Sequence, residues 1–150
     1  LQALFEAVYA QSDIHFDHPR PAYFFFFFAD ADSGGVLFTY RRDDRLIGWN
    51  LCYERGGRLI DKYVGFRYPD ARENNLYALS WMHNIDYAIQ RGLTHYVAGW
   101  TDPQVKAQLG ASFTFTRHLV YARSALLRLL LRRVSARFER DRQWHDESSA

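Results

Sequence analysis

Residues 36–66, VLFTYRRDDRLIGWNLCYERGGRLIDKYVGF, decide the fold class of this 150-residue chain. Three runs rich in β-forming residues, 36–41, 46–53 and 58–66, are separated by short polar turns. Turns of this length join antiparallel neighbours, and Gly56-Gly57 supplies the positive φ that they need. The stretch therefore predicts a three-stranded antiparallel meander.

Alternation along the third run assigns its side chains to two faces of the sheet. The first face would carry Leu59, Asp61, Tyr63 and Gly65, and the second Ile60, Lys62, Val64 and Phe66. Asp61 and Tyr63 are therefore expected to point the same way.

Helical patterns precede the meander. Residues 1–10 repeat apolar side chains at helical spacing. After a proline-containing loop, Pro21 is expected to start a short helix that holds five consecutive phenylalanines and ends near Ala31.

A longer helix follows the meander, from a cap at Asn74 or Asn75 to about Arg91, with Gly92 as its C-terminal glycine. Its expected buried stripe contains Ala78, Met82, Ile85 and Ile89, widened by Trp81 and Ala88. Residues 93–98 then form a short strand, which a helical crossover places parallel to the third strand.

The remaining pattern predicts a helix capped by Thr101 or Asp102 and stopped by Gly110, a strand over 112–122, and a basic helix over 123–140. The predicted fold is mixed α/β: a central mixed sheet flanked by helices, with an extra C-terminal basic helix. Residues 1–122 form the expected domain, and 123–150 the basic amphipathic helix and tail.

Composition narrows the class of protein. Hydrophobic content of 48% suits a packed globular domain, and no apolar run approaches the roughly 20 residues that span a bilayer. The single cysteine, Cys52, excludes an internal disulfide framework and favours the cytoplasm. Because the chain begins at Leu1, we expect a piece of a longer protein, with an upstream partner half.

Charge is distributed unevenly along the chain. No acidic residue lies between Asp102 and Glu139, a segment that holds seven lysines and arginines. The leucine stripe and arginines of 123–140 suit an anionic membrane surface or RNA, and equally a helix docked on the sheet with its arginines in water. The sequence also leaves a homo-oligomer open.

Three segments carry a resemblance to a known family. Tyr87-Ala88-Ile89-Gln90-Arg91-Gly92-Leu93 resembles a helix end leading into the parallel strand of GNAT-superfamily N-acyltransferases of the Fem-type and predicted N-acyltransferase branch. Gly99, Lys106 and Gly110 are similar to that branch's glycine–lysine–glycine pattern, and residues 9–16 resemble its lead-in. The resemblance covers residues 1 to 122.

That resemblance implies an acyl-CoA N-acyltransferase fold and transfer of an acetyl or aminoacyl group to a small-molecule or peptide amine, by direct attack. In the family, two parallel strands separate at their carboxyl ends and bind the donor, here a coenzyme A thioester such as acetyl-CoA or another acyl-CoA. The implied donor-binding residues are Val64, Gly65, Asn74, Asn75, Gly99 and Trp100.

The expected phosphate loop departs from the superfamily pattern. Residues 67–75 contain no glycine, and Asp70 and Glu73 would repel a pyrophosphate at the helix start. Fem-type members lack this loop because they take their acyl group from aminoacyl-tRNA. The departure also favours a second class of function, a non-catalytic GNAT-like lobe that binds a substrate or partner; an RNA- or membrane-binding module is a third.

Candidate catalytic residues follow from the chemistry. Lys106 would stabilise an oxyanion or hold a donor phosphate, while Asp61 and Tyr63 would serve proton removal beside the cleft. Weaker candidates are the pair His83 and Asp86, and His118. The cluster of Asp13, His15, Asp17 and His18 matches no metal signature, so no metal is expected.

Overall fold

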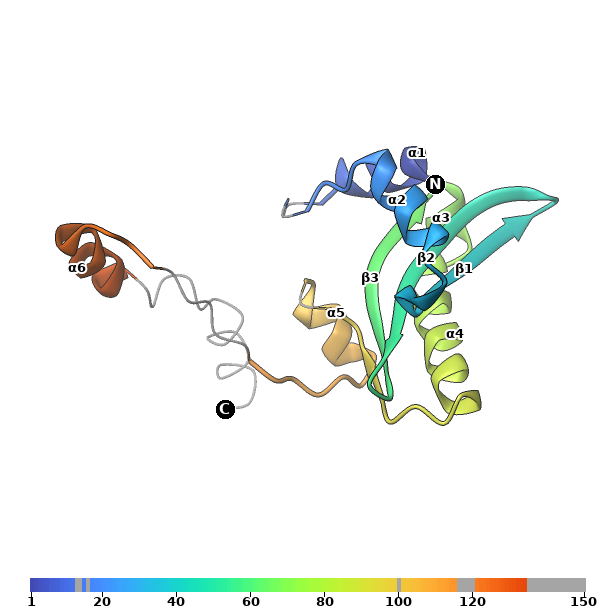
Figure 1. Ribbon diagram of the computed structural model, residues 1–150. Helices are drawn as coiled ribbons and strands as arrows, with labels where there is room; N and C mark the ends of the chain where they lie inside the picture. The colour runs from blue at the N-terminus through green and yellow to red at the C-terminus, as the bar shows by residue number, and fades with distance from the viewer. Residues whose placement is uncertain (13–14, 16, 100, 116–120, 135–150) are drawn as a thin grey trace. The chain divides into compact units, whose positions relative to one another are not determined.

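The computed structural model describes residues 1–12, 15, 17–99, 101–115 and 121–134. The chain divides into two compact units, residues 1–101 and 102–150, and the predicted boundary at 122 lies inside the second. The first unit contains a four-stranded sheet with helices on both of its faces (Figure 1). The predicted mixed α/β class is confirmed.

The sheet has the strand order β1-β2-β3-β4. Strands β1 (Gly35–Arg42), β2 (Arg45–Arg55) and β3 (Arg58–Phe66) form the predicted antiparallel meander. Strand β4 (His95–Val97) pairs with β3 in parallel, as the crossover predicted, although only Arg58–Ile60 take part.

Two N-terminal helices cover one face of the sheet. Helix α1 (Gln2–Tyr9) and helix α2 (Pro21–Ala29) lie where the sequence placed them, and η1 (Ala31–Ser33) leads into β1. The phenylalanine run is divided by helical periodicity: Phe24 and Phe27 are buried against Trp49 and Leu51, whereas Phe25 and Phe26 are exposed. Leu4 and Phe5 of α1 complete this core.

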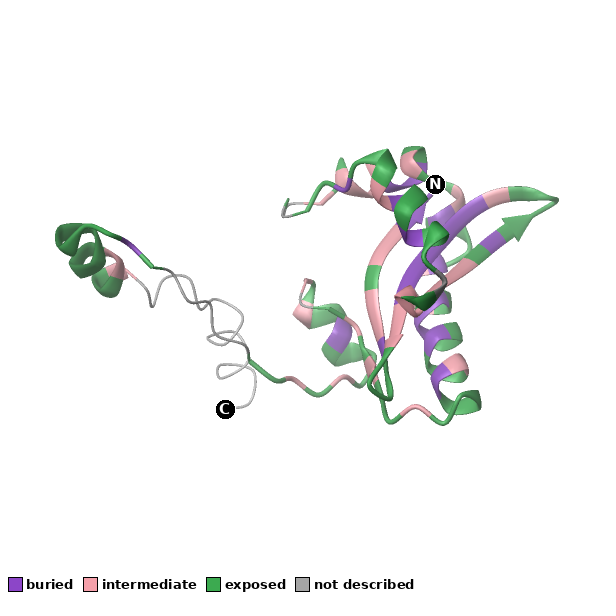
Figure 2. Cartoon of the chain, in the orientation of Figure 1, coloured by how far each residue is buried: buried purple, intermediate pink, exposed green. Residues whose placement is uncertain are grey.

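Helices α3 (Asp70–Glu73) and α4 (Leu76–Gln90) pack on the opposite face. Figure 2 shows α4 with a buried side toward the sheet and an exposed side away from it. The predicted stripe was right for Trp81 and Ala88, which are buried, and wrong for Met82 and Ile89, which are 65% and 70% exposed. The buried side also includes two polar residues, Ser80 and Asn84. Ser80 donates to the Tyr77 carbonyl within the helix, and Asn84 donates to Asn50 of the sheet, so both donor groups are satisfied.

The ends of α4 follow the sequence in part. Gly92 has φ +66°, and the amides of Gly92 and Leu93 donate to Ile89 and Ala88, a complete C-terminal Schellman arrangement. Asn75 occupies the N-cap position with φ +49°, but its side chain makes no capping bond. The predicted position is therefore right and the predicted side-chain cap is wrong.

The second unit contains α5 (Pro103–Gln108) and α6 (Ala125–Val134). The predicted strand over 112–122 is absent from residues 112–115 and 121–122, and 116–120 lie outside the described residues. The predicted terminal helix is present as far as Val134, and 135–140 again lie outside. Of the helices in the described ranges, none is long and apolar enough to cross a bilayer.

Candidate functional site

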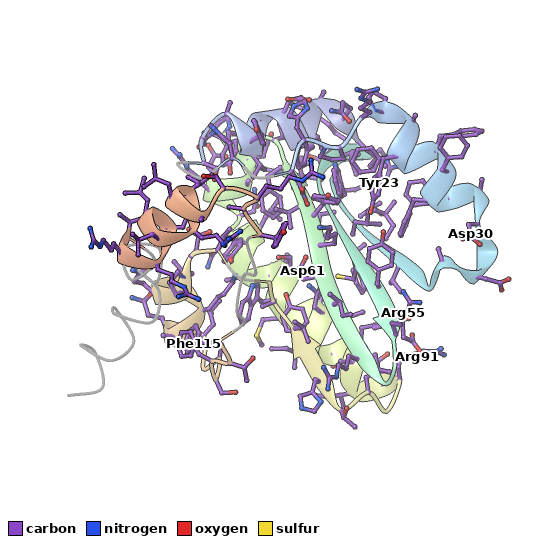
Figure 3. The ribbon with its side chains drawn as sticks, turned by 60° about the vertical axis from the view of Figure 1, so that its left-hand side comes forward. Tyr23, Asp30, Arg55, Asp61, Arg91 and Phe115 are labelled. Carbon is purple, nitrogen blue, oxygen red and sulfur yellow. The ribbon has the colours of Figure 1, made fainter. Side chains whose placement is uncertain are left out.

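The parallel strand pair ends where two-thirds of β3 still remains. Ile60 pairs with Val97, the last residue of β4, and β3 continues through Asp61 to Phe66. Asp61 is thus the first residue beyond the parallel pairing; Figure 3 labels it midway along the sheet. Beyond Asp61, β3 and β4 are no longer joined by backbone hydrogen bonds. Open α/β sheets bind ligands at strand ends of this kind.

The Asp61 carboxylate is held by donors from three different elements. Asn50 of β2 donates from Nδ2 to Oδ1 at 2.7 Å, and Tyr96 of β4 donates from its hydroxyl to Oδ2 at 2.7 Å. The Nδ2 of Asn84, on α4, lies 3.5 Å from the same Oδ2. Donors converging on both oxygens fix the carboxylate and stabilise its charge.

The partners of Asp61 are buried or half-buried and are joined to one another. Asn84 Nδ2 donates to Asn50 Oδ1 at 2.7 Å and to the Tyr96 hydroxyl at 3.0 Å. Asn50 and Asn84 are completely buried. Burial, and then the charge of Asp61, raises the pKa of Tyr96 well above its usual range, so its hydroxyl keeps the proton that it donates.

Two buried polar atoms beside this network have no hydrogen-bond partner among the residues that the structure describes. They are the Asn84 Oδ1 atom and the Tyr40 hydroxyl. Burial raises the pKa of the Tyr40 hydroxyl, and the nearby Asp61 carboxylate raises it further. Because an unsatisfied buried acceptor costs about 1–3 kcal/mol, the network is costly for a purely structural core.

Cys52 belongs to the same network and is not a nucleophile there. Its thiol is completely buried and donates to Asn50 Oδ1 at 3.2 Å. Burial, followed by the Asp61 charge, raises its pKa far above neutrality. The thiolate needed for covalent catalysis is therefore disfavoured.

Tyr63 does not share the face of Asp61, contrary to the sequence prediction. A β-bulge intervenes: Leu51 pairs with Tyr63 and the next β2 residue, Cys52, pairs with Asp61, which leaves Lys62 as an extra residue. The insertion reverses the alternation, so Asp61 faces α4 while Tyr63 packs with Phe5 of α1. The prediction assumed strict alternation along the strand and therefore did not allow for an extra residue.

The Tyr63 side carries its own polar contacts. Lys62 Nζ pairs with Asp17 Oδ2 at 2.9 Å, and the Tyr63 hydroxyl donates to the same oxygen at 3.3 Å. Lys62 lowers the pKa of Asp17, and burial raises the pKa of Tyr63. Tyr63 is therefore a protonated, packed side chain on the far side of the sheet from Asp61.

The segment between β3 and α4 should repel anions less than its sequence predicted, because arginines lie beside its two acidic side chains. Asp70 Oδ2 lies 3.7 Å from Arg45 Nη2, and Glu73 Oε2 lies 3.9 Å from Arg42 Nη1. These arginines offset both acidic charges. Asn74 donates from its side chain to the Asp70 carbonyl at 2.8 Å, and the first helical bond of α4 runs from the Leu79 amide to Asn75. The preceding amides, Leu76–Ala78, form the positive end of the helix.

Gly65 has a packing reason for lacking a side chain. A Cβ at this position would lie closer than 3.0 Å to the Trp49 indole nitrogen, which donates to the Leu1 carbonyl at 3.0 Å. Its neighbour Val64 is half-buried and packs with the core below α3 and α4. The donor-binding roles predicted for Val64 and Gly65 stay predictions.

The glycine–lysine–glycine segment is described in its parts. Gly99 follows β4 with φ +73°, and a Cβ there would lie 3.9 Å from the Asp61 carbonyl oxygen. Trp100 lies outside the described residues. Lys106, on α5 of the second unit, is only 4% exposed. Burial of a lysine is uncommon and marks it as more than a surface residue of a short helix.

Of the weaker candidates, the structure describes His83 and Asp86. His83 stacks on Tyr40 with ring centroids 5.6 Å apart, whereas Asp86 accepts a hydrogen bond from Gln90. His83 and Asp86 thus have separate partners, and the alternative of a base paired with an orienting carboxylate is not formed. His118 and Asp13 lie outside the described residues.

The histidines of the first loop have other contacts. His15 stacks on Tyr9 at 4.3 Å, and His18 Nε2 lies 2.9 Å from Glu6 Oε2. Across the described ranges, no three side chains of metal-binding type gather into a group.

Sequence reasoning found Asp61 but missed Asn50, Asn84 and Tyr96. One observation pointed to them: Asn50 interrupts an apolar strand, and an amide in such a position needs a partner when buried. The partner itself lies 34 positions away on α4, at a distance that no local pattern covers.

Comparison with known proteins gives a consistent result. Residues 1–107 match the family model described as an acetyltransferase (GNAT) domain. A ribosomal-protein-alanine N-acetyltransferase from Brucella melitensis biovar Abortus 2308 has a similar fold, with a TM-score of 0.54 and 18% identity. The alignment covers 79% of this chain and 88% of that one. No curated protein sequence matches.

Proposed function

Since the chain belongs to the GNAT acetyltransferase-domain family, we propose that it transfers an acyl group from a coenzyme A thioester to an amine. The observation that carries this proposal is the position of Asp61. It is the first residue past the parallel β3–β4 pairing, and Asn50 and Tyr96 fix its carboxylate there.

The described residues fit such a donor at two places. The β3 edge beyond Ile60 is not paired with β4, so its backbone is suited to a pantetheine arm. The amides of Leu76–Ala78 suit a pyrophosphate, because Arg45 and Arg42 offset the acidic side chains nearby. When bound, the thioester supplies an activated acyl carbonyl.

Asp61 serves the acceptor in this proposal. An amine reaches its reactive form by losing a proton from its ammonium, and the Asp61 carboxylate accepts it directly or through one water. The nitrogen then attacks the acyl carbon; the C–N bond forms, the C–S bond breaks, and the thiolate leaves and takes up a proton. Asn50 and Tyr96 keep the carboxylate in place throughout.

The family resemblance also suggests roles for Lys106 and Gly99 in binding the donor. Lys106 would hold a donor phosphate or stabilise the tetrahedral oxyanion, as a positioned ammonium can. Gly99 and Trp100 would line the donor cleft, together with Val64, Asn74 and Asn75.

The test is coenzyme A release from acetyl-CoA over a panel of primary amines, with Asp61→Asn compared against Asp17→Asn. Both variants remove one carboxylate, but Asp17 lies with Tyr63 on the other face of the sheet. We expect Asp61→Asn to lower kcat/KM by about 10²–10⁴-fold and Asp17→Asn to change it little. Retained activity in Asp61→Asn would assign Asp61 a structural role.

A Fem-type donor is the second candidate, because residues 67–75 lack the glycines of the usual phosphate loop. If the donor is of the Fem type, calorimetry should show no saturable binding of coenzyme A, and the chain should transfer an aminoacyl group from aminoacyl-tRNA. If neither donor supports transfer and neither binds, the chain is a non-catalytic lobe.

A further inference from the structure

Helix α6 presents an apolar face that is not buried. Leu126 is 78% exposed, Leu127 46%, Leu129 51% and Leu130 56%, and no residue of the helix is buried. Leu126 and Leu130 are four residues apart and share one side of the helix. A contiguous group of exposed leucines marks an interaction surface.

The opposite side of α6 is cationic. Arg128 and Arg132 are also four residues apart, about half a turn from Leu126 and Leu130. Arg133 is seven residues from Leu126 and therefore lies on the leucine side, and Arg123 lies two residues before the helix begins. No acidic residue lies between Asp102 and Glu139, so this stretch of sequence carries positive charge only.

The helix is already formed and capped. Ser124 Oγ accepts from the Leu127 amide at 3.4 Å, and the Arg128 amide donates to the Ser124 carbonyl at 3.0 Å. The Arg128 guanidinium also donates to the carbonyls of Ala122 and Arg123 at 2.9 and 3.0 Å. A preformed amphipathic helix loses little conformational freedom when it binds.

We propose that α6 binds the surface of a bilayer that contains anionic phospholipids. The leucines enter the boundary between headgroups and acyl chains, and the arginines remain among the phosphates. Lipid is favoured over RNA because α6 offers four exposed leucines and no aromatic ring on which a base could stack.

The experiment is co-sedimentation of the 150-residue chain with vesicles of phosphatidylcholine, with and without 30 mol% phosphatidylglycerol. Binding is expected only with the anionic lipid, and raising the salt from 50 to 500 mM should weaken it. Two variants separate the contributions. Leu126→Gln with Leu130→Gln keeps the charge and should lower the partition coefficient about 100-fold, or roughly tenfold per leucine.

Arg123→Gln with Arg133→Gln keeps the leucines and should lower the partition coefficient about 30-fold, or roughly fivefold per arginine. The matched control, Met82→Gln with Ile89→Gln, removes two exposed apolar side chains from α4 and should bind vesicles like the wild type. Circular dichroism establishes that each variant is folded.

Three results would overturn the proposal. One is equal binding by the leucine variant and the wild type. Another is binding to single-stranded RNA, but not to vesicles, that the leucine substitutions leave unchanged. The third is that the chain does not bind anionic vesicles but dimerises in a concentration-dependent way, and that the leucine variant no longer dimerises.

Discussion

The Tyr96 hydroxyl donates to Asp61 Oδ2 at 2.7 Å and so joins β4 to β3 just past their last paired residues. Tyr96 lies opposite Leu59 in the parallel ladder, and its side chain reaches the next residue on the same side, Asp61. A side-chain bond thus continues the contact between the strands where the backbone ladder ends.

Tyr96→Phe should destabilise the first unit and impair the proposed site. It removes the donor to Asp61 and an acceptor of Asn84, and the expected loss of unfolding free energy is about 1–3 kcal/mol. Urea denaturation measures the loss. Tyr87→Phe, which removes a bond to the carboxylate of Glu54, is the matched control for stability without an effect on transfer. Equal effects of the two variants on kcat would contradict the role given to Tyr96.

Asn84→Asp should make stability fall as the pH rises. The new carboxyl would be buried within 3.5 Å of Asp61, so burial and like charge would raise its folded pKa above the unfolded value of about 3.9. A raised acid pKa favours the folded state at low pH, and the loss grows as pH increases above about 4. Denaturation at pH 5 and pH 7.5 tests this, with Asn84→Leu as the uncharged reference. A flat difference between the two variants would refute the expectation.

Gly65→Ala should cost about 1–3 kcal/mol, because the added methyl overlaps the Trp49 indole. In a Trp49→Leu background the same substitution should cost much less, since the indole is gone. The measurement is a double-mutant cycle by urea denaturation. If the cost is the same in both backgrounds, the glycine is required for another reason.

Glu54 should make the first unit less stable in acid. Its carboxylate accepts from Tyr87 at 2.9 Å and from Arg91 at 3.2 Å, and Arg91 is the main cause that lowers its pKa from 4.5. Figure 3 places Arg91 near Arg55, where β2 ends. A lowered acid pKa contributes stability above the unfolded value, and that contribution is lost as the pH falls below about 4.5.

Glu54→Gln should therefore lose less stability than the wild type between pH 6 and pH 3. Urea midpoints across this range measure the difference. Arg91→Gln, which removes the partner, should flatten the same part of the profile. A wild-type profile in both variants would show that this ion pair is too solvated to matter.

Local chemistry made several features predictable. The meander follows from β-rich runs and short polar turns, and the α4 terminus from Gly92, whose φ of +66° is costly for other residues. Pro21 likewise marks the start of α2. Each of these depends on neighbours within a few positions, which is the range over which sequence patterns carry information.

The face predictions failed for a different reason. Periodicity ranks side chains by polarity, yet Ser80 and Asn84 are buried on α4 and Met82 and Ile89 are exposed. Hydrogen bonds make the burial of these polar side chains tolerable: Ser80 donates to Tyr77 within α4, and Asn84 donates to Asn50 on a distant strand.

The sequence by itself determined the antiparallel meander, the parallel crossover and the helices α1, α2 and α4 that flank the sheet. The tertiary structure alone decided which way Asp61 and Tyr63 point, because the bulge at Lys62 exists only in the pairing of β2 with β3. It also decided which groups hold the carboxylate, since Asn50, Asn84 and Tyr96 meet it through long-range packing. Partners of a buried charge are selected by three-dimensional proximity, which local sequence does not encode.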